Sequence, residues 1–340
     1  MALSTIGITG ANGFLGGHLL RSALARGLRP IALIERGSSL APIADLAGRY
    51  EPVEGDVCEP ASVDAFVARC GAVFHLAGLN RYWARDRTRF HAVNVDGVRH
   101  VAEACLRHRV RVVHASSCIT LGASDTPVPR DEDAPYNLAF DFAYAASKQA
   151  GEAEIEQAVQ RGLPAVIVHP ASAIGEQDFA PTPIGRPIAD IARGWWPAYV
   201  AGGACFIDVH DLVRGLWLAM ERGAVGRHYL LVGENLTNRQ FMTLVAERAG
   251  VAPPRVRLPG PLLDAAGAAS EWLADHVTHR PPRLTRSMAR LIGKFLFFDG
   301  ARAARELGFQ AGPVAPAVER CLAWFRARPA CGRAWEARWT

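Results

Sequence analysis

The sequence predicts an α/β fold, with a doubly wound parallel sheet followed by a smaller, mostly helical part. Two observations predict it. Apolar, strand-like runs alternate with amphipathic helical patterns through the first half of the chain, which is typical of a parallel sheet covered by helices on both faces. A glycine-rich turn also joins the first apolar run to the first helical pattern, as it does in sheets whose ligand cleft lies at the carboxyl ends of the strands.

The apolar runs place the strands, and a change of pattern near residue 171 divides the chain. Beyond that point, Pro-rich breaks at 253–261 and 281–282 interrupt the alternation. We therefore expect a Rossmann-type domain over 1–170, a substrate-binding part over 171–328 and a flexible tail over 329–340. The expected strands are 4–9, 30–34, 51–54, 72–76, 110–115 and 164–169, with a further strand near 227–232 that returns to the main sheet.

The glycine-rich segment predicts a dinucleotide site. Gly10, Gly13 and Gly16 form the pattern G-x-x-G-x-x-G before a predicted helix. Glycines there let the backbone approach a pyrophosphate, and the helix N-terminus offers unpaired N–H groups. Glu35 closes the second predicted strand, nineteen residues after Gly16, where a carboxylate would bind the ribose hydroxyls. We expect NAD(H), and the adjacent Arg36 keeps NADP(H) open because an arginine accommodates a 2′-phosphate.

A phenol and an ammonium predict the chemistry. Tyr144 and Lys148 lie four residues apart at the start of a predicted helix, so both point to the same face. The ammonium is expected to lower the pKa of the phenol from roughly 10 toward neutrality. Such a pair is an acid/base device for alcohol and carbonyl chemistry.

Composition narrows the class of protein. The 340 residues, 50% of them hydrophobic, have room for one large or two modest domains. The net charge is +5, but the arginines are scattered, which disfavours nucleic acid as a partner. Seven cysteines without a CxxC pair predict neither a disulfide framework nor a metal site. Without a signal-peptide pattern or an 18-residue apolar run, we expect a cytoplasmic protein with no integral membrane segment, and peripheral membrane contact stays open.

Several motifs together resemble the extended short-chain dehydrogenase/reductase superfamily, the NAD-dependent epimerase/dehydratase group. Within it, segments such as LNRYWARD and FFDGARAARELGF resemble the branch of dihydroflavonol reductases, 3β-hydroxysteroid dehydrogenases and hopanoid-associated sugar epimerase proteins. The motifs that carry the resemblance are TGANGFLG (9–16), GDV (55–57), HLAG (75–78), NVDG (94–97), ASSCITLG (115–122), Tyr144 with Lys148, and HPASAIG (169–175).

The resemblance implies roles for the matching positions. Ser117 would hold the substrate oxygen, Tyr144 would donate and accept the proton, and Lys148 would bond the nicotinamide ribose. For Asn94, a structural role in tying loops together is an open alternative. The implied cofactor-binding residues are Gly10, Asn12, Gly13, Phe14, Leu15, Gly16, Glu35, Arg36, Asp56, Val57, Leu76, Ala77, Gly78, Asn94, Ser116, Tyr144, Lys148, His169 and Pro170.

The resemblance also bears on the substrate. This chain has His169 and Ala204-Cys205 where sugar-nucleotide enzymes of the superfamily look to place an Asn and an Arg against a second diphosphate. A buried diphosphate would be poorly compensated without them. We therefore expect an uncharged, hydrophobic small molecule that is flavonoid-, sterol- or lipid-like. The expected substrate-binding residues are Tyr82, Trp83, Phe142, Ser172, Trp196 and Tyr199.

The expected function is thus that of an NAD(P)-dependent dehydrogenase/reductase that interconverts a secondary alcohol and a ketone by hydride transfer. Two alternatives stay open, namely an epimerase or dehydratase that retains its NAD, and a non-catalytic, dinucleotide-binding regulatory protein. The resemblance also implies a homodimer that pairs the predicted helices 87–107 and 142–161.

Overall fold

The structure, a computed structural model, describes residues 4–282 and 284–328. Its main sheet is parallel and has the strand order β10-β6-β5-β4-β1-β2-β3. Each strand agrees with its predicted position to within one residue at either end, and the predicted fold class is confirmed. The strands are β1 (Thr5–Thr9), β2 (Arg29–Ile34), β3 (Glu51–Glu54), β4 (Ala72–His75), β5 (Arg111–Ala115), β6 (Ala165–Pro170) and β10 (His228–Leu231).

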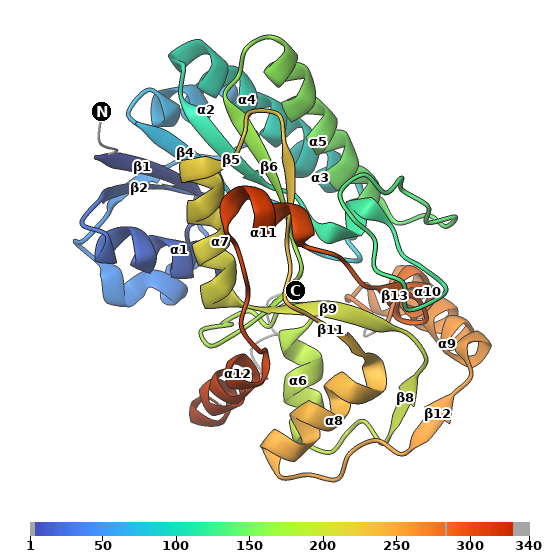
Figure 1. Ribbon diagram of the computed structural model, residues 1–340. Helices are drawn as coiled ribbons and strands as arrows, with labels where there is room; N and C mark the ends of the chain where they lie inside the picture. Colours follow the sequence, from blue (N-terminus) through green and yellow to red (C-terminus); the bar gives the residue numbers. More distant parts are fainter. Residues whose placement is uncertain (1–3, 283, 329–340) are drawn as a thin grey trace.

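Helices cover both faces of this sheet, as Figure 1 shows. One face carries α2 (Pro60–Val67), α4 (Gly97–His108) and α5 (Ala143–Gln160), and the other carries α1 (Phe14–Ala25), α7 (Val209–Arg222) and α11 (Ala301–Leu307). Alternate strand residues enter different cores, since Val73 and Val112 belong to the core under α4 whereas Phe74 and Val113 belong to the core under α7. Burial on both faces explains why the strands read as nearly continuous apolar runs.

The predicted helix 87–107 is interrupted in a way that the sequence did not indicate. A short α3 (Thr88–His91) continues through a π-helical segment (Ala92–Asp96) into α4. A Cβ atom built on Gly151 of α5 would lie 2.2 Å from the carbonyl oxygen of Asn94 in that segment. The glycine therefore allows α5 to pack directly against the wide turn, and π-helical turns of this kind are frequent at functional sites.

The second part of the chain contains two small sheets that the sequence pattern did not indicate. Strands β11, β9 and β13 are neighbours in one, with β7 also paired to β9, and β12 pairs with β8 in the other. The elements are β7 (Ser172–Ile174), α6 (Gly185–Ala192), β8 (Ala198–Val200), β9 (Gly203–Asp208), β11 (Glu234–Thr237), α8 (Asn238–Ala249), β12 (Val256–Leu258), α9 (Gly260–Leu273), α10 (Arg286–Ile292), β13 (Phe295–Leu296) and α12 (Ala315–Ala327).

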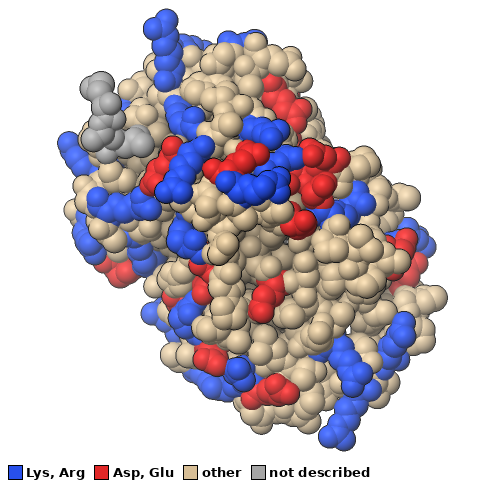
Figure 2. Space-filling view, viewed as in Figure 1, with Lys and Arg blue, Asp and Glu red and all other residues tan. Residues whose placement is uncertain are grey.

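The charge on the surface and the length of the helices bear on possible partners. On the face in Figure 2, basic and acidic side chains are intermingled. Within the described ranges, no helix combines the length and the apolar character needed to cross a bilayer. The predicted tail, 329–340, lies outside the described residues.

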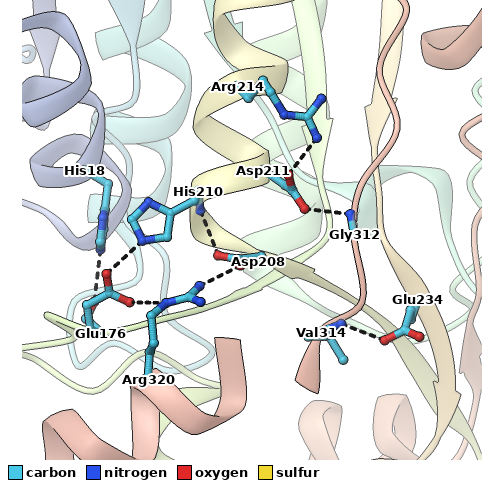
Figure 3. Close-up of polar contacts among 10 residues, drawn as sticks. All are labelled: His18, Glu176, Asp208, His210, Asp211, Arg214, Glu234, Gly312, Val314 and Arg320. Atoms are coloured by element: carbon cyan, nitrogen blue, oxygen red, sulfur yellow. Dashed lines mark hydrogen bonds and ion pairs between the residues drawn. The ribbon is translucent and has the colours of Figure 1, made fainter. Parts of the chain in front are cut away.

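A polar cluster joins the two parts of the chain (Figure 3). His18 on α1 donates to the backbone oxygen of Glu176, which follows β7, at 3.0 Å. The Glu176 carboxylate accepts from His210 on α7 at 2.8 Å and from Arg320 on α12 at 3.0 Å. Arg320 also reaches Asp208 at 2.6 Å. These bonds link α12 to α1 and α7 through Glu176 and Asp208.

Candidate active site

The glycine turn after β1 is packed too tightly for side chains. Gly10 has a φ of +68°, and a Cβ atom on it would lie 2.8 Å from the backbone nitrogen of Ala77. A Cβ atom on Gly16 would lie 2.0 Å from the carbonyl oxygen of Gly10. Helix α1 then begins at Phe14 without a side-chain cap at Gly13. A bare backbone cradle at an uncapped helix N-terminus fits the pyrophosphate of a dinucleotide.

The two candidate ribose-binding residues after β2, Glu35 and Arg36, have different surroundings. Glu35 has a side chain that is 58% exposed and lies 3.8 Å from Arg89. The guanidinium of Arg36 forms an ion pair with the carboxylate of Glu54 at 2.8 Å, and its side chain is 86% exposed. A carboxylate is therefore available at the strand end, while the neighbouring guanidinium is already paired, and this arrangement favours a free ribose hydroxyl over a 2′-phosphate.

Three of the expected cofactor residues use their side chains to shape the protein. Asn12 donates to Ser38 at 2.9 Å, which ties the glycine turn to the loop after β2. Asp56 accepts a backbone N–H within its own turn at 2.9 Å. Ser116 donates to the buried carboxyl of Glu152, away from the glycine turn. These bonds engage the amide nitrogen of Asn12, one carboxylate oxygen of Asp56 and the hydroxyl of Ser116 within the protein.

The loop after β4 is fixed to the end of β1. The Thr9 hydroxyl oxygen accepts from the backbone N–H groups of Leu76 and Ala77, each at 3.1 Å. A Cβ atom on Gly78 would lie 3.8 Å from Nζ of Lys148. The glycine turn, this loop and the lysine thus meet at one edge of the sheet. Of the other expected cofactor residues, Leu15 lies in the first turn of α1, Val57 follows β3, and His169 and Pro170 end β6.

Asn94 is fully engaged within the protein. Its oxygen accepts from the backbone of Leu79 at 2.8 Å, and its nitrogen donates to Ser147 on α5 at 2.9 Å. The side chain is buried, at 1% exposure. These contacts support the structural alternative, in which Asn94 ties the loop after β4 to α5.

Tyr144, Lys148 and Ser117 come together from α5 and the turn after β5. Tyr144 and Lys148 are 7% and 5% exposed. A hydrogen bond from Ser117 reaches the phenol of Tyr144. The ammonium of Lys148 donates to the carbonyl oxygen of Ala115, at the end of β5, at 2.8 Å.

The electrostatics of this pair differ from the expectation. Burial raises the pKa of Tyr144 to about 12 and outweighs the hydrogen bond from Ser117, which lowers it. Burial also lowers the pKa of Lys148 to about 8, against the attraction of Glu152. The predicted depression of the phenol pKa by Lys148 is therefore wrong for the protein alone, because desolvation dominates and the ammonium faces a backbone carbonyl.

A cavity of about 630 Å³ lies next to the phenol. Tyr82 and Trp83, two of the expected substrate-binding residues, line it together with Phe90 and Phe140. The ring of Tyr82 lies 5.9 Å from that of Tyr144, which is outside the described lining of the cavity. Tyr82 therefore forms the wall between the cavity and the phenol. Phe142 packs beside both tyrosines, at 5.3 Å from Tyr82 and 6.0 Å from Tyr144.

Three other expected substrate residues lie outside the lining of this cavity, and their role stays a prediction. Ser172 is in β7, Tyr199 is in β8 beneath the guanidinium of Arg239, and Trp196 is 39% exposed. None of the three belongs to the described lining of the cavity. They were predicted from their position in the sequence after β6. That position does not indicate how the second part of the chain packs against the main sheet.

Arginines in the lining of the cavity were not indicated by the sequence. Arg87 pairs with Asp141 at 2.6 Å, and Arg286 and Arg290 share Asp264. These arginines come from segments about 200 residues apart in the chain, so no local signal could group them. The charged or basic residues in the lining are Arg85, Arg87, Asp141, Glu271, Asp275, His279, Arg286 and Arg290.

Comparisons with known proteins agree with this geometry. Residues 6–232 match the NAD dependent epimerase/dehydratase family. Sterol demethylase protein B of Methylococcus capsulatus is 32% identical over 325 residues, 94% of this chain and 98% of that protein. A putative dihydroflavonol 4-reductase of Synechocystis is 28% identical over 331 residues, 94% of each chain. The crystal structure of gox2253 gives a TM-score of 0.83 at 34% identity and covers 95% of this chain and 98% of that one. The resemblance read from the motifs is confirmed, and the chain belongs to the NAD dependent epimerase/dehydratase family.

Proposed function

We propose that the protein interconverts a secondary alcohol and a ketone on an uncharged, hydrophobic substrate that is flavonoid-, sterol- or lipid-like. One observation carries the proposal. The buried phenol of Tyr144, hydrogen-bonded by Ser117, lies against the rings of Tyr82 and Phe142 beside a roomy cavity. The aromatic rings in the lining, Tyr82, Trp83, Phe90 and Phe140, suit a flat molecule whose reactive oxygen would face the phenol.

The residues divide the work as follows. NAD, held by the glycine turn, supplies the hydride acceptor or donor. Ser117 orients the substrate oxygen, and Tyr144 moves the proton at that oxygen. Lys148, whose ammonium lies near Gly78 in the loop after β4, would bond the nicotinamide ribose and so hold the cofactor in place. The protein therefore contributes placement and electrostatics.

The relatives support a ring-system substrate. Their names refer to sterols and to a dihydroflavonol, both of which are flat and largely apolar. Each relative matches nearly the whole chain, including the second part that closes over the cavity. We extend only the substrate class to this protein.

A second candidate is an epimerase or dehydratase that retains its NAD. The arginines on the rim of the cavity favour it, because guanidinium groups match the geometry of phosphate oxygens. Arg87, Arg286 and Arg290 are already paired with carboxylates, so an anionic ligand would compete with Asp141 and Asp264. That competition is why we rank this candidate second.

The test is a comparison of alcohols. Purified protein is mixed with NAD⁺ and a 3β-hydroxysteroid, a flavonoid alcohol or a nucleotide sugar, and NADH is followed at 340 nm. We expect NADH with a ring-system alcohol, and Tyr144→Phe should lower kcat by about 10²- to 10⁴-fold. Tyr50→Phe, which alters a partly buried tyrosine in the core on the opposite face, is the matched control. Conversion of a nucleotide sugar without net NADH, by protein that keeps its NAD through purification, would favour the second candidate instead.

A further inference from the structure

Helix α9 has its polar and apolar sides in the reverse of the usual order for a helix at a protein surface. Within this helix, all of which the structure describes, no exposed position holds a polar or charged side chain. A surface helix ordinarily turns its apolar side toward the core. The exposed side chains recur at a spacing of three and four residues and form one apolar stripe along α9, made of Leu262, Ala265, Ala266, Ala269, Trp272 and Leu273.

The two charged side chains of α9 lie on its inner side, against α10. The carboxylate of Asp264 lies 3.3 Å from Arg286 and 2.8 Å from Arg290. Glu271 accepts a hydrogen bond from the backbone N–H of Arg286 at 3.0 Å. Between the two acids, Gly267 is buried, and a Cβ atom on it would lie 2.8 Å from a backbone carbonyl oxygen just before α10. The polar side therefore anchors α9 to the protein and leaves the apolar stripe uncovered.

The uncovered surface is large for a soluble protein. Leu262 and Trp272 are 58% and 59% exposed, Leu273 is 45% exposed, and Val277 in the π-helical turn that continues α9 (Ala274–Thr278) is 59% exposed. At about 200 Å² for a whole large side chain, these four expose roughly 400 Å² together. Continuous apolar patches of this size mark interaction sites.

The size and shape of the stripe favour a bilayer over a second protein surface. A stable protein dimer buries about 800 Å² on each partner, roughly twice what these four side chains expose. A single helix with one apolar side, by contrast, is enough to bind in the interfacial region of a membrane. At 1.5 Å per residue, the 14 residues of α9 extend for about 21 Å, so the stripe can lie flat on such a surface.

The charges that border the stripe fit anionic lipid headgroups. Arg255 and Arg257 are exposed at β12, before the stripe begins, and Arg280 is exposed after it ends. Arginines at the edge of an apolar helix face add electrostatic attraction to anionic lipids. The ring of Trp272 stacks on that of His276 at 5.0 Å, which joins an apolar ring to a polar one, as is common at the headgroup level.

The opposite side of α9 forms a wall of the large cavity. Glu271, Ala274 and Asp275 belong to the lining of that cavity. The carboxylate of Asp275 accepts a hydrogen bond from the indole N–H of Trp83, also in the lining, at 3.0 Å. In Figure 1, α9 lies at the right-hand edge of the molecule. One helix therefore separates the cavity from whatever covers the apolar stripe.

We propose that the apolar stripe of α9 docks on the surface of a lipid bilayer that contains anionic lipids. Trp272 and Leu273 would enter the boundary between headgroups and acyl chains, and the arginines at either end would lie at the lipid phosphates. Docking in this way places the cavity directly beside the bilayer. The proposal goes beyond the reaction proposed for Tyr144 and does not depend on it.

The test measures binding of the full chain to vesicles. Protein is mixed with vesicles made of equal parts of phosphatidylcholine and phosphatidylglycerol, and the bound fraction is measured by flotation. We expect the wild type to float with these vesicles and to bind pure phosphatidylcholine vesicles about tenfold or more weakly, because the arginines lose their partners. Leu273→Glu should lower the partition coefficient for the mixed vesicles by roughly tenfold or more.

A leucine elsewhere on the surface provides the matched control. Leu40, in the segment after β2, is 46% exposed, against 45% for Leu273. Leu40→Glu changes the net charge by the same amount, so it should bind the mixed vesicles as the wild type does. Both changed residues are exposed, and circular dichroism shows whether each variant is folded.

Three results would overturn the docking proposal. The first is a wild type that does not float with the mixed vesicles, and the second is equal binding by the wild type and a folded Leu273→Glu. The third is a dimer, seen by sedimentation velocity, that Leu273→Glu dissolves while neither protein binds vesicles, because the stripe would then belong to a second copy. Oxidation of a ring-system alcohol that is lost in Tyr144→Phe alongside any of these results would leave the proposed function standing.

Discussion

The most informative single substitution is Gly16→Ala, because its effect on cofactor binding follows from the packing around Gly16 and does not depend on the identity of the substrate. The new Cβ atom would lie 2.0 Å from the carbonyl oxygen of Gly10 and 2.8 Å from Cα of Ala11, both of them backbone. Relief to an ordinary contact of 3.4 Å requires the turn and the helix to part by about 1.4 Å, and no flexible side chain can absorb that shift.

The expected cost follows from that overlap. Forcing a methyl group into a closely packed site costs about 1 to 3 kcal/mol, and here the strain falls on the backbone that must hold the pyrophosphate. Expressed as affinity, this is a roughly five- to 150-fold increase in the Kd for NAD. Isothermal titration with NAD⁺ measures it, with circular dichroism to show that the variant is folded.

Two other glycines calibrate this measurement. A Cβ atom on Gly13 would lie 3.2 Å from the oxygen of Gly10, so Gly13→Ala should weaken binding less. Gly260 has nothing within 4 Å and should tolerate alanine with no change in Kd. Unchanged NAD affinity in a folded Gly16→Ala variant would refute the assignment of the glycine turn as the pyrophosphate cradle.

Three other predictions concern the cofactor, packing and pH. Glu35→Gln should raise the Kd for NAD about tenfold, as expected for a lost charged hydrogen bond, with less effect on NADP binding. Asn94→Ala should lower the free energy of unfolding in urea by about 1 to 3 kcal/mol, because it leaves the backbone N–H of Leu79 without its partner. Burial would raise the pKa of Glu176, but hydrogen bonds from His210 and its other neighbours lower it to about 2, so its stabilisation should be lost as the pH falls from 4.5 to about 2.

Each of these has an outcome that would contradict it. Equal losses of NAD and NADP affinity in Glu35→Gln would remove the ribose assignment. Wild-type urea unfolding of Asn94→Ala would show that its hydrogen bonds contribute nothing to stability. The pKa of His210 is raised from 6.5, so its own stabilisation is present below pH 6.5 and declines as the pH rises through the raised value. A Glu176→Gln variant with the same dependence of Tm on pH as the wild type would contradict the linkage.

The parts of the fold and site that could be predicted are those with local causes. The strands are apolar because both faces are covered, and the glycines at 10, 13 and 16 sit in a turn whose form depends on a few neighbouring residues. The spacing of Tyr144 and Lys148 placed both on one face of α5 for the same reason. The other catalytic and cofactor-binding residues were inferred from the superfamily resemblance, whose motifs occur in the expected order along the chain.

The parts that could not be predicted depend on contacts between distant segments. The pKa of Tyr144 rises because of burial under Tyr82 and Phe142, and no i,i+4 argument contains that desolvation. Trp196 and Tyr199 follow β6 in the sequence but do not belong to the described lining of the cavity, whereas arginines near 87 and 290 both line it.

The central claim is that Tyr144 serves net oxidation of an alcohol carbon on a hydrophobic ring system, and an isotope measurement tests it directly. A ring-system alcohol bearing deuterium at its carbinol carbon is incubated with NAD⁺, and both products are examined by mass spectrometry. We expect a ketone and an NADH that carries the deuterium, with neither formed by Tyr144→Phe. Deuterium that stays on, or returns to, the starting carbon while no NADH accumulates would contradict it.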